Sequence, residues 1–592
     1  MNPAVCRQQT RSKREVTEAL PVSGGRYPGC RRGRPRLRAP RPDEGPFRPR
    51  MTRPMTPSLR LLCAALALLP TSAFAQQLDW RVLASDSGQV LAPGLPAVSR
   101  SLQEPLLGDR GRDLIGVRIN SPSAQAGFWT WQAGSFQRWF QFSASGALGP
   151  GRSGAEAGHQ FLEVASGYGA AAPDGQRLVR ARAGDPAATL NSSWGLWRWN
   201  GSSNIEIARH GTDGSLGPNL GANWVFEPGA SNFAEAQMLN GGRALLVATV
   251  LSPGNVESRL VARHEPGFGN RPCLRSGSTD PALAPGLAVG DSFLSFSQTL
   301  DRFVSTPEGR VFALLPATNT RDAIFELCEG APRAIAANRD TAALGPFVAE
   351  AGAEFVNFYR LRPSPSQGLV FAVDWRTPGT ASRPGIFRHD GSRNLPVAYG
   401  DSSGYYGPNW LGSTWSSMSD LSVADDWSAF IASVRTSDGG SATGLWRVRM
   451  GERPQLVALL SLTDPAYVPE PGRTWRTFNA MAVLRDGSLV LDASTNPNQT
   501  RDLWLLKPPQ APRRLLSIGQ SLPVPTTSGP VSTVVAGFTL PGDGNPETGR
   551  DGWVGDDGQL LLRVSTNTYG TVLVTTRLSL PAPGALFSDG FE

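Results

Sequence analysis

Lysine, histidine and helix-forming stretches are scarce in this chain. Of its 592 residues only two are Lys and four are His, whereas Gly contributes 66 and Pro 50. Gly and Pro interrupt helices, and beyond the N-terminal region no apolar stretch keeps a 3.6-residue period for long. The composition therefore argues against a mainly helical protein and favours short strands joined by turns.

Long apolar runs are also missing. The run at residues 61–69 is shorter than the roughly 18 to 20 residues that span a bilayer. It lies between the basic Arg60 and the small-x-small site at Ala73 and Ala75, which is the pattern of a secretory signal peptide. We predict a signal peptide at residues 51–75, cleavage between Ala75 and Gln76, no transmembrane segment, and an exported protein that is periplasmic or extracellular.

Residues 1–50 are crowded with Arg and Pro and precede that signal, although a signal peptide works only at an N-terminus. Two interpretations remain open: a spurious extension, with translation starting at Met51 or Met55, and a disordered basic arm. Residues 1–75 hold 15 of the 57 Lys and Arg but 4 of the 49 Asp and Glu, which leaves 42 basic and 45 acidic residues beyond them. This balance argues against a nucleic-acid partner.

The dominant feature that is present is an internal repeat. An apolar strand preceded by Gly leads to a central strand that typically opens Gly-Leu-aromatic, and then to a third strand with a Pro-Gly loop. The central strand starts eight times, in steps of 58 to 68 residues, at Gly127, Gly195, Ser258, Ala323, Gly385, Gly444, Asp502 and Gly570. The last copy lacks the third strand, and a copy of that strand opens the mature chain at Trp80.

Units of about 60 residues with three or four short strands suit the blades of a propeller. The complementary fragments at the two ends predict that the strand near Trp80 pairs beside the strand near Val572, which closes the ring and removes exposed edges. We therefore predict an all-β fold over residues 76–580: a single β-propeller with eight blades, or seven as the alternative. Residues 581–592 form a tail, for which a sorting signal and a plain disordered end both stay open.

Cysteines are few, and only Cys273 and Cys328 lie beyond the signal peptide. Because they occupy similar places in consecutive units, they predict either one disulfide between neighbouring blades or two buried thiols. Zinc would require four closely spaced ligands, so we predict no metal site. No catalytic residue and no cofactor-binding motif emerges either, and we predict no cofactor.

Recurring polar residues have structural interpretations. Three His residues lie near strand ends of different units, and three Arg residues share one place in the central strand, where their stems would pack on the next blade. These residues are His210, His264, His389, Arg198, Arg388 and Arg447. Most of the 16 Trp also recur in strands, which indicates packing between blades. Trp410 and Trp415 lie in a Gly/Ser-rich stretch, and we predict that they are aromatics of a ligand-binding face.

The run GLWRWNGSSNIEIARHGTDGSLGPN, with GIFRHDG from Gly385 and LVARHEPG from Leu260, resembles secreted bacterial tandem-repeat proteins with an Asn-x-x-Gly-x-x-Ala-Phe motif. The resemblance covers nearly all of the mature chain, but the motif Asn is replaced, for example by Leu239 and Thr306. It implies a propeller-like exported protein of unassigned activity. We expect a monomeric binding module for an unknown ligand, a glycan or a protein. The alternative is a glycan-active hydrolase or lyase with its site across the propeller channel.

Overall fold

The computed structural model describes residues 78–95, 100, 102–107, 115–119, 126–165, 174–188, 191–229, 233–296, 302–306, 308–318, 321–400, 404–541, 553–555 and 557–580. These residues belong to the unit Gln76–Glu592, which is considered by itself. The predictions for the N-terminal extension, for the signal peptide with its cleavage site between Ala75 and Gln76, and for the tail at residues 581–592 lie outside the described residues.

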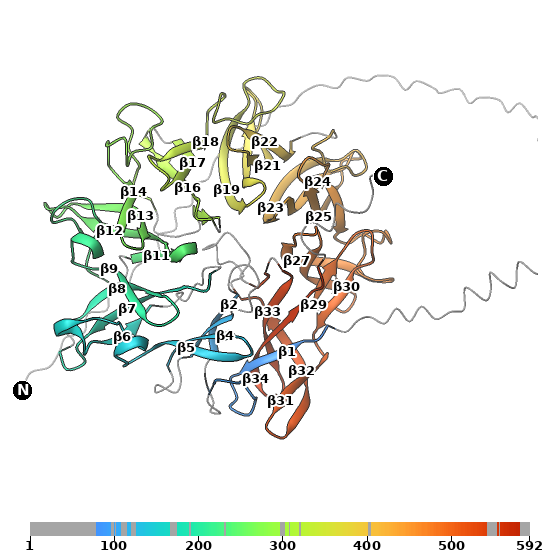
Figure 1. The fold of residues 1–592 in the computed structure, drawn as a ribbon. Helices are drawn as coiled ribbons and strands as arrows, with labels where there is room; N and C mark the ends of the chain where they lie inside the picture. Colours follow the sequence, from blue (N-terminus) through green and yellow to red (C-terminus); the bar gives the residue numbers. More distant parts are fainter. Residues whose placement is uncertain are drawn as a thin grey trace, which may run out of the picture. The chain divides into compact units, whose positions relative to one another are not determined.

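Eight antiparallel sheets follow one another along the chain and surround a common axis (Figure 1). We call them blades I to VIII. Blade I contains β2 (Leu102–Leu107), β3 (Ile115–Ile119), β4 (Gly127–Gln132) and β5 (Ser135–Gln141). Blade II contains β6 (Gln160–Val164), β7 (Arg177–Gly184), β8 (Ser193–Trp199) and β9 (Asn204–Arg209). Blade III contains β10 (Val225–Phe226), β11 (Phe233–Met238), β12 (Ala244–Leu251), β13 (Glu257–Glu265) and β14 (Gly269–Arg275). Blade IV contains β15 (Phe303–Ser305), β16 (Val311–Ala317), β17 (Arg321–Leu327) and β18 (Arg333–Ala337).

The second half of the ring continues in the same order. Blade V contains β19 (Glu354–Ser364), β20 (Gly368–Arg376), β21 (Arg383–His389) and β22 (Asn394–Tyr399). Blade VI contains β23 (Thr414–Ala424), β24 (Trp427–Arg435), β25 (Ser441–Arg449) and β26 (Gln455–Leu459). Blade VII contains β27 (Thr474–Val483), β28 (Leu489–Asn496), β29 (Thr500–Leu506) and β30 (Arg513–Ser517). Blade VIII contains β31 (Ser521–Thr526), β32 (Gly529–Thr539), β33 (Gln559–Thr566), β34 (Gly570–Arg577) and β1 (Arg81–Ser85). Short 3-10 helices in the loops are η2 (Gly146–Leu148), η3 (Gly154–Glu156), η5 (Gly214–Leu216) and η6 (Asn240–Gly242).

In the four-stranded blades the strands run from the axis outward as an up-and-down meander, whereas β31 of blade VIII lies away from the axis (Figure 1). The first strands of blades IV to VII contact one another: β15 contacts β19, β19 contacts β23 and β23 contacts β27, which places them innermost (Figure 1). The predicted central strands are the third strands of the six four-stranded blades, together with β13 of blade III and β34 of blade VIII, which have an additional strand. The strands predicted before and after them are their two neighbours in each sheet, and in blade VIII these neighbours are β33 and β1. The eight-bladed propeller is therefore confirmed, and the alternative of seven blades is wrong.

Ring closure depends on β1. This strand pairs antiparallel with β34, with Arg81 opposite Thr575 and Ser85 opposite Val572, so the first described strand becomes the outermost strand of the last blade. The Thr576 hydroxyl also donates to the Asp79 carbonyl over 3.0 Å. The predicted pairing of the two ends is confirmed.

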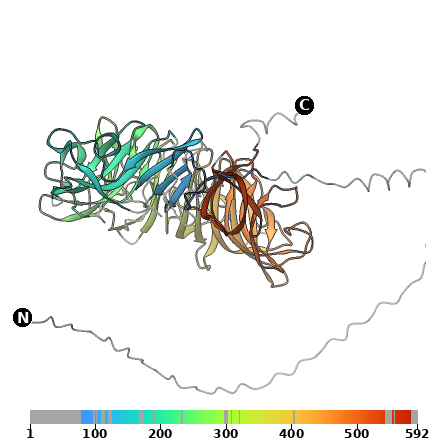
Figure 2. The same cartoon turned by 90° about the horizontal axis from the view of Figure 1, so that it is seen from below.

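The hydrophobic core lies between the blades, and it continues across the closure. Val82 of β1 packs into the cluster that joins blades VII and VIII. Its neighbour Leu83 packs into the cluster that joins blades VIII and I. Because successive side chains of a strand face opposite sides, one short strand supplies apolar contacts to both of its neighbouring blades. Seen from the side in Figure 2, the sheets stand next to one another around the ring.

A bulge recurs where the third strand pairs with the fourth. The register shifts after Leu196 in blade II and after Leu445 in blade VI, and the following residues, Trp197 and Trp446, are fully buried. Their indole Nε1 atoms donate to the carbonyls of Pro150 and Pro408, over 3.1 and 3.0 Å. These carbonyls lie in the Gly-Pro loops that lead from one blade to the next. The bulge therefore directs a large ring into the interface and fixes the connecting loop.

Candidate functional site

The innermost strands of blades V, VI and VII share a sequence pattern at intervals of 60 residues. Phe355, Trp415 and Trp475 occupy the second position of β19, β23 and β27, and all three are buried in the core. Apolar residues recur three positions later, at Phe358, Met418 and Phe478. These side chains pack the strands against their blades. The positions between them do not contribute to this packing, and several of them are exposed.

Each of these three strands carries two bulges against the second strand of its blade. A bulge inserts an unpaired residue and breaks the alternation of faces, so consecutive residues become exposed. We define the inner-strand surface as the polar side chains that these strands present away from the blade core. They are Asn357, Tyr359, Arg360, Ser416, Ser417, Ser419, Asp420, Arg476, Thr477 and Asn479. Since their strands are innermost, the surface faces the ring axis.

Charged and aromatic groups concentrate in the blade V part of the inner-strand surface. Tyr359 is 55% exposed, and its hydroxyl donates to the Asp374 carboxylate of β20. Burial, and then the hydrogen bond to Asp374, raises the pKa of Tyr359, so the phenol stays protonated. The neighbouring Arg360 forms an ion pair of 3.0 Å with Asp420 of blade VI, which links the two inner strands.

Asp420 also adopts a backbone conformation that few side chains favour. It is the residue that the second bulge of β23 leaves unpaired, and its φ is +46°. Asp tolerates this left-handed region better than most residues. The second bulge of β23 therefore places Asp420 out of the ladder, where it forms the ion pair with Arg360.

The blade VII part continues into a buried polar network. Asn479 donates from Nδ2 to the Asp492 carboxylate over 3.1 Å, and Arg501 donates from Nε to the same carboxylate over 2.9 Å. The side chain of Asp492 is fully buried, so Arg501 supplies the counter-charge that it needs. The Arg501 guanidinium in turn lies 4.9 Å from the ring centre of Phe538 in blade VIII. The buried carboxylate of Asp492 thus fixes the side chain of Asn479, while Arg476 and Thr477 on the same strand are exposed to solvent.

The prediction of two ligand-facing tryptophans needs correction. Trp415 is 3% exposed, its ring lies edge-on to that of Trp446 at 5.0 Å, and its Nε1 donates to the Tyr406 carbonyl. It belongs to the blade-facing side of β23 and not to a loop, so stacking on a ligand is excluded. Trp410 is half-buried and packs against the same core. The exposed aromatic residue on this strand set is Tyr359, which the sequence pattern did not single out.

The recurring histidines have structural contacts. The Nδ1 atoms of His264 and His389 lie 3.2 and 3.1 Å from the side-chain oxygens of Asn270 and Asn394. Those Asn side chains donate to backbone carbonyls of the preceding blade, such as Ile207 for Asn270. Each pair therefore links two blades, and burial lowers the pKa of both His rings.

His210 differs from them, since its ring stacks on Phe233 with centroids 4.1 Å apart. Its Nδ1 accepts from the Gly229 amide over 3.2 Å.

The recurring arginines connect blades. Arg198 of blade II donates to the Gly242 carbonyl of blade III over 3.2 Å, and Arg447 of blade VI donates to the Gly487 carbonyl of blade VII over 2.6 Å. At these two positions the structure shows a guanidinium hydrogen bond to the backbone of the next blade. We call this contact the Arg latch.

Cys273 and Cys328 form a disulfide that joins β14 of blade III to the end of β17 of blade IV, with Cα atoms 4.7 Å apart.

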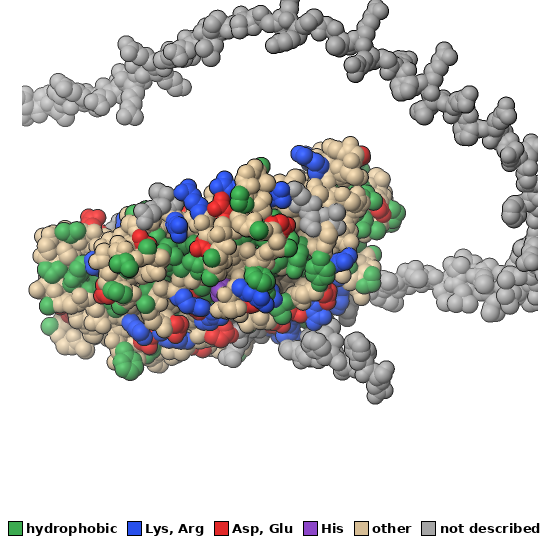
Figure 3. Space-filling model, turned by 90° about the horizontal axis from the view of Figure 1, so that it is seen from above, with side chains coloured by type: hydrophobic (Ala, Val, Ile, Leu, Met, Phe, Trp, Pro, Cys, Tyr) green, Lys and Arg blue, Asp and Glu red, His purple; other side chains and the backbone are tan. Residues whose placement is uncertain are grey.

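Among the residues that the structure describes, no three His, Cys, Asp or Glu side chains gather in a way that could hold a metal ion. In the same part of the chain, no helix combines the length and apolarity of a membrane crossing. On the face in Figure 3, basic and acidic side chains lie interspersed among neutral ones.

No family model matches the chain, and neither does any curated protein. Similar solved structures include the β-propeller domain of the Trilobed protease from Pyrococcus furiosus, with 10% identity, 70% of this chain and 98% of that chain covered, and a TM-score of 0.28. A puromycin-hydrolyzing peptidase of Mycobacterium tuberculosis has 13% identity, 74% and 62% coverage, and a TM-score of 0.23. A Trypanosoma rangeli sialidase has 11% identity, 73% and 70% coverage, and a TM-score of 0.22. Similarity at this level transfers no activity to this chain.

Proposed function

We propose that the chain is an exported binding protein that takes a polar, glycan-like ligand on the inner-strand surface. The observation that carries this proposal is the double bulge of β19, β23 and β27, which exposes hydrogen-bonding side chains in succession. Amide, hydroxyl and guanidinium groups of neighbouring blades, with Tyr359 as an exposed ring, suit a ligand rich in hydroxyl groups. The outer strands build the scaffold that holds this surface rigid.

Export is the second part of the proposal. The signal-like residues 51–75 support it, and an interblade disulfide suits an oxidising compartment. Fractionation of cells that express the chain from Met51 tests it directly. The mature unit is expected outside the cytoplasm, and replacement of Ala73 and Ala75 by bulky residues should block its maturation. Retention of the unchanged chain in the cytoplasm would contradict export.

A glycan-active hydrolase or lyase is the competing hypothesis, and Tyr359 with Asp374 is its best candidate pair. A tyrosine nucleophile requires a lowered pKa or an adjacent base that removes its proton. The raised pKa of Tyr359 opposes this role, whereas Asp374, which accepts the hydrogen bond of the phenol, has the position of an adjacent base. We propose binding without turnover on the raised pKa of Tyr359, and a turnover screen decides between the two hypotheses.

The test combines a glycan array with a broad hydrolase and lyase screen on the folded unit. We expect reproducible binding to a class of glycans and no turnover of those glycans. Turnover that Asp374→Asn or Asp420→Asn abolishes would replace the binding proposal by the enzyme. An array without any signal above that of Tyr359→Ala would contradict a glycan ligand.

A further inference from the structure

Blade VII lacks the Arg latch. In blades II and VI, the residue after the bulge aromatic of the third strand is the latch arginine, Arg198 or Arg447. In blade VII the same register position, after Trp504, is occupied by Leu505. A leucine has no guanidinium that could extend across the interface. The Arg latch is therefore missing at the junction of blades VII and VIII.

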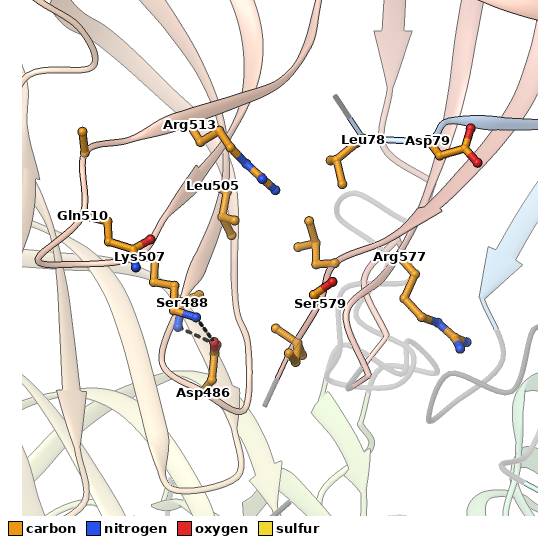
Figure 4. A pocket seen from close by; sticks show the side chains of 13 residues that line it. Leu78, Asp79, Asp486, Ser488, Leu505, Lys507, Gln510, Arg513, Arg577 and Ser579 are labelled. Atoms are coloured by element: carbon orange, nitrogen blue, oxygen red, sulfur yellow. Dashed lines mark hydrogen bonds and ion pairs between the residues drawn. The ribbon is translucent and has the colours of Figure 1, made fainter. Parts of the chain in front are cut away.

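That junction contains a pocket with a volume of about 360 Å³ (Figure 4). Its volume lies within the range of small-molecule sites. Its apolar wall is formed by four leucines from both blades, and the polar groups include two serines and a glutamine. The leucines are Leu78, Leu505, Leu578 and Leu580, and the neutral polar residues are Ser488, Gln510 and Ser579.

Arg513, the first residue of β30, directs its guanidinium into this space, as Figure 4 shows. Its Nε is buried without a hydrogen-bond partner, and among the described residues no carboxylate forms an ion pair with it. The buried Nε of this guanidinium loses solvation that no described residue replaces. An anionic ligand would restore both the charge and the hydrogen bonds.

The other charged groups of the pocket are already engaged or turned away. Lys507 pairs with Asp486 at 3.4 Å, and Arg577 pairs with Asp557 at 2.7 Å. The Asp79 carboxylate points away from the space into which Arg513 extends (Figure 4). The charge that remains to be matched is therefore the single positive charge of Arg513, beside an aliphatic wall.

We propose that the junction of blades VII and VIII binds a small monocarboxylate with a short aliphatic body. The carboxylate accepts hydrogen bonds from Arg513, and the body contacts the leucines. The site is separate from the inner-strand surface and does not depend on the proposed glycan ligand.

Isothermal titration calorimetry of the folded unit with hexanoate tests the proposal, in a buffer without other carboxylates. Two further ligands separate the contributions: 1-hexanol keeps the body without the charge, and inorganic sulfate keeps charge without the body. We expect one hexanoate per chain and at least tenfold weaker binding of both other ligands. The variant Arg513→Gln should weaken hexanoate at least tenfold, and Arg513→Lys should weaken it less.

Two more variants keep the test decisive. Arg435→Gln removes an exposed arginine of blade VI and should leave hexanoate binding unchanged. Leu505→Trp narrows the pocket and should weaken hexanoate while Arg513 is retained, which covers the case in which Arg513→Gln fails to fold. The proposal is overturned if hexanoate does not bind the unaltered unit, if 1-hexanol binds as tightly, or if Arg435→Gln weakens binding as much as Arg513→Gln.

Discussion

In blades V to VII, the outer three strands and the innermost strand differ in which of their side chains are buried. In the outer strands, apolar residues recur, a bulge aromatic such as Trp446 returns in several blades, and the third strand of blade VI is buried on both faces over most of its length. In the innermost strands of blades V to VII, only the blade-facing positions recur, and polar residues such as Tyr359 and Asn479 occupy the rest. The difference separates a scaffold set by packing from a surface available for recognition, and substitutions in the two regions should have opposite effects on stability and binding.

The largest effect is expected in the scaffold. Trp446→Ala removes a fully buried ring and its hydrogen bond to Pro408, so the free energy of unfolding should fall by about 3 to 5 kcal/mol. Phe268→Ala, at a ring that is 83% exposed in the turn after β13, is the control and should change it by less than about 0.5 kcal/mol. Denaturant midpoints of both variants measure this. Similar denaturant midpoints for Trp446→Ala and Phe268→Ala would contradict the view that the buried strands contribute more to stability than the exposed surface.

The disulfide should contribute the next largest effect. It closes a loop with a sequence separation of 55, for which the chain-entropy description gives about 4 kcal/mol. The double variant Cys273→Ser and Cys328→Ser should therefore unfold at a clearly lower denaturant concentration. A reductant should lower the midpoint of the unaltered unit and leave that of the double variant in place. Insensitivity of the unaltered unit to reductant would speak against a stabilising interblade bond.

A smaller, pH-dependent effect is expected from His210. Burial, and then the positive charge of Arg180, lowers the pKa of His210 from 6.5 to about 3. Between these values the unfolded chain takes up a proton that the folded chain does not, so the free energy of unfolding falls as pH decreases from about 6.5 toward 3. His210→Gln should flatten this part of the stability profile, as measured by thermal unfolding at several pH values. Equal slopes for variant and parent would show that His210 does not contribute.

The smallest effect on stability is expected on the inner-strand surface. Arg360 and Asp420 are 49% and 44% exposed, and exposed ion pairs contribute about 0.2 to 1 kcal/mol. Arg360→Gln and Asp420→Asn, alone and together, should each shift the unfolding midpoint only slightly, and a double-mutant cycle measures their coupling. A coupling well above 1 kcal/mol would mean that this surface also serves as scaffold.

The sequence predicts the scaffold well because packing repeats in it. Gly385 and Gly444 each lie two residues before a bulge aromatic, and such pairs locate the third strands of the blades. The pairing of β1, which begins directly after Trp80, with the last blade follows from the missing fourth strand there. These features depend on contacts that recur in several blades.

The innermost strands of blades V to VII are not predicted from the sequence, because their bulges interrupt the alternation of buried and exposed residues. Exposed neighbours such as Tyr359 and Arg360, or Arg476 and Thr477, resemble a loop. The same effect assigns Trp415 to a ligand-facing loop although it is core. The spacing of 60 residues between Phe355, Trp415 and Trp475 is the signal that could have located these strands. The unpaired state of Arg513 depends on which side chains meet in space, and no spacing predicts it.

The most direct measurement is the binding of a glycan-array ligand by three forms of the folded unit: the parent, Tyr359→Ala and Phe268→Ala. Both variants remove an exposed ring, one from the inner-strand surface and one from an outer turn. The account predicts that Tyr359→Ala binds at least tenfold more weakly with an unchanged melting temperature, while Phe268→Ala binds like the parent. Parent-like binding by Tyr359→Ala, together with weakened binding by Phe268→Ala, would contradict it.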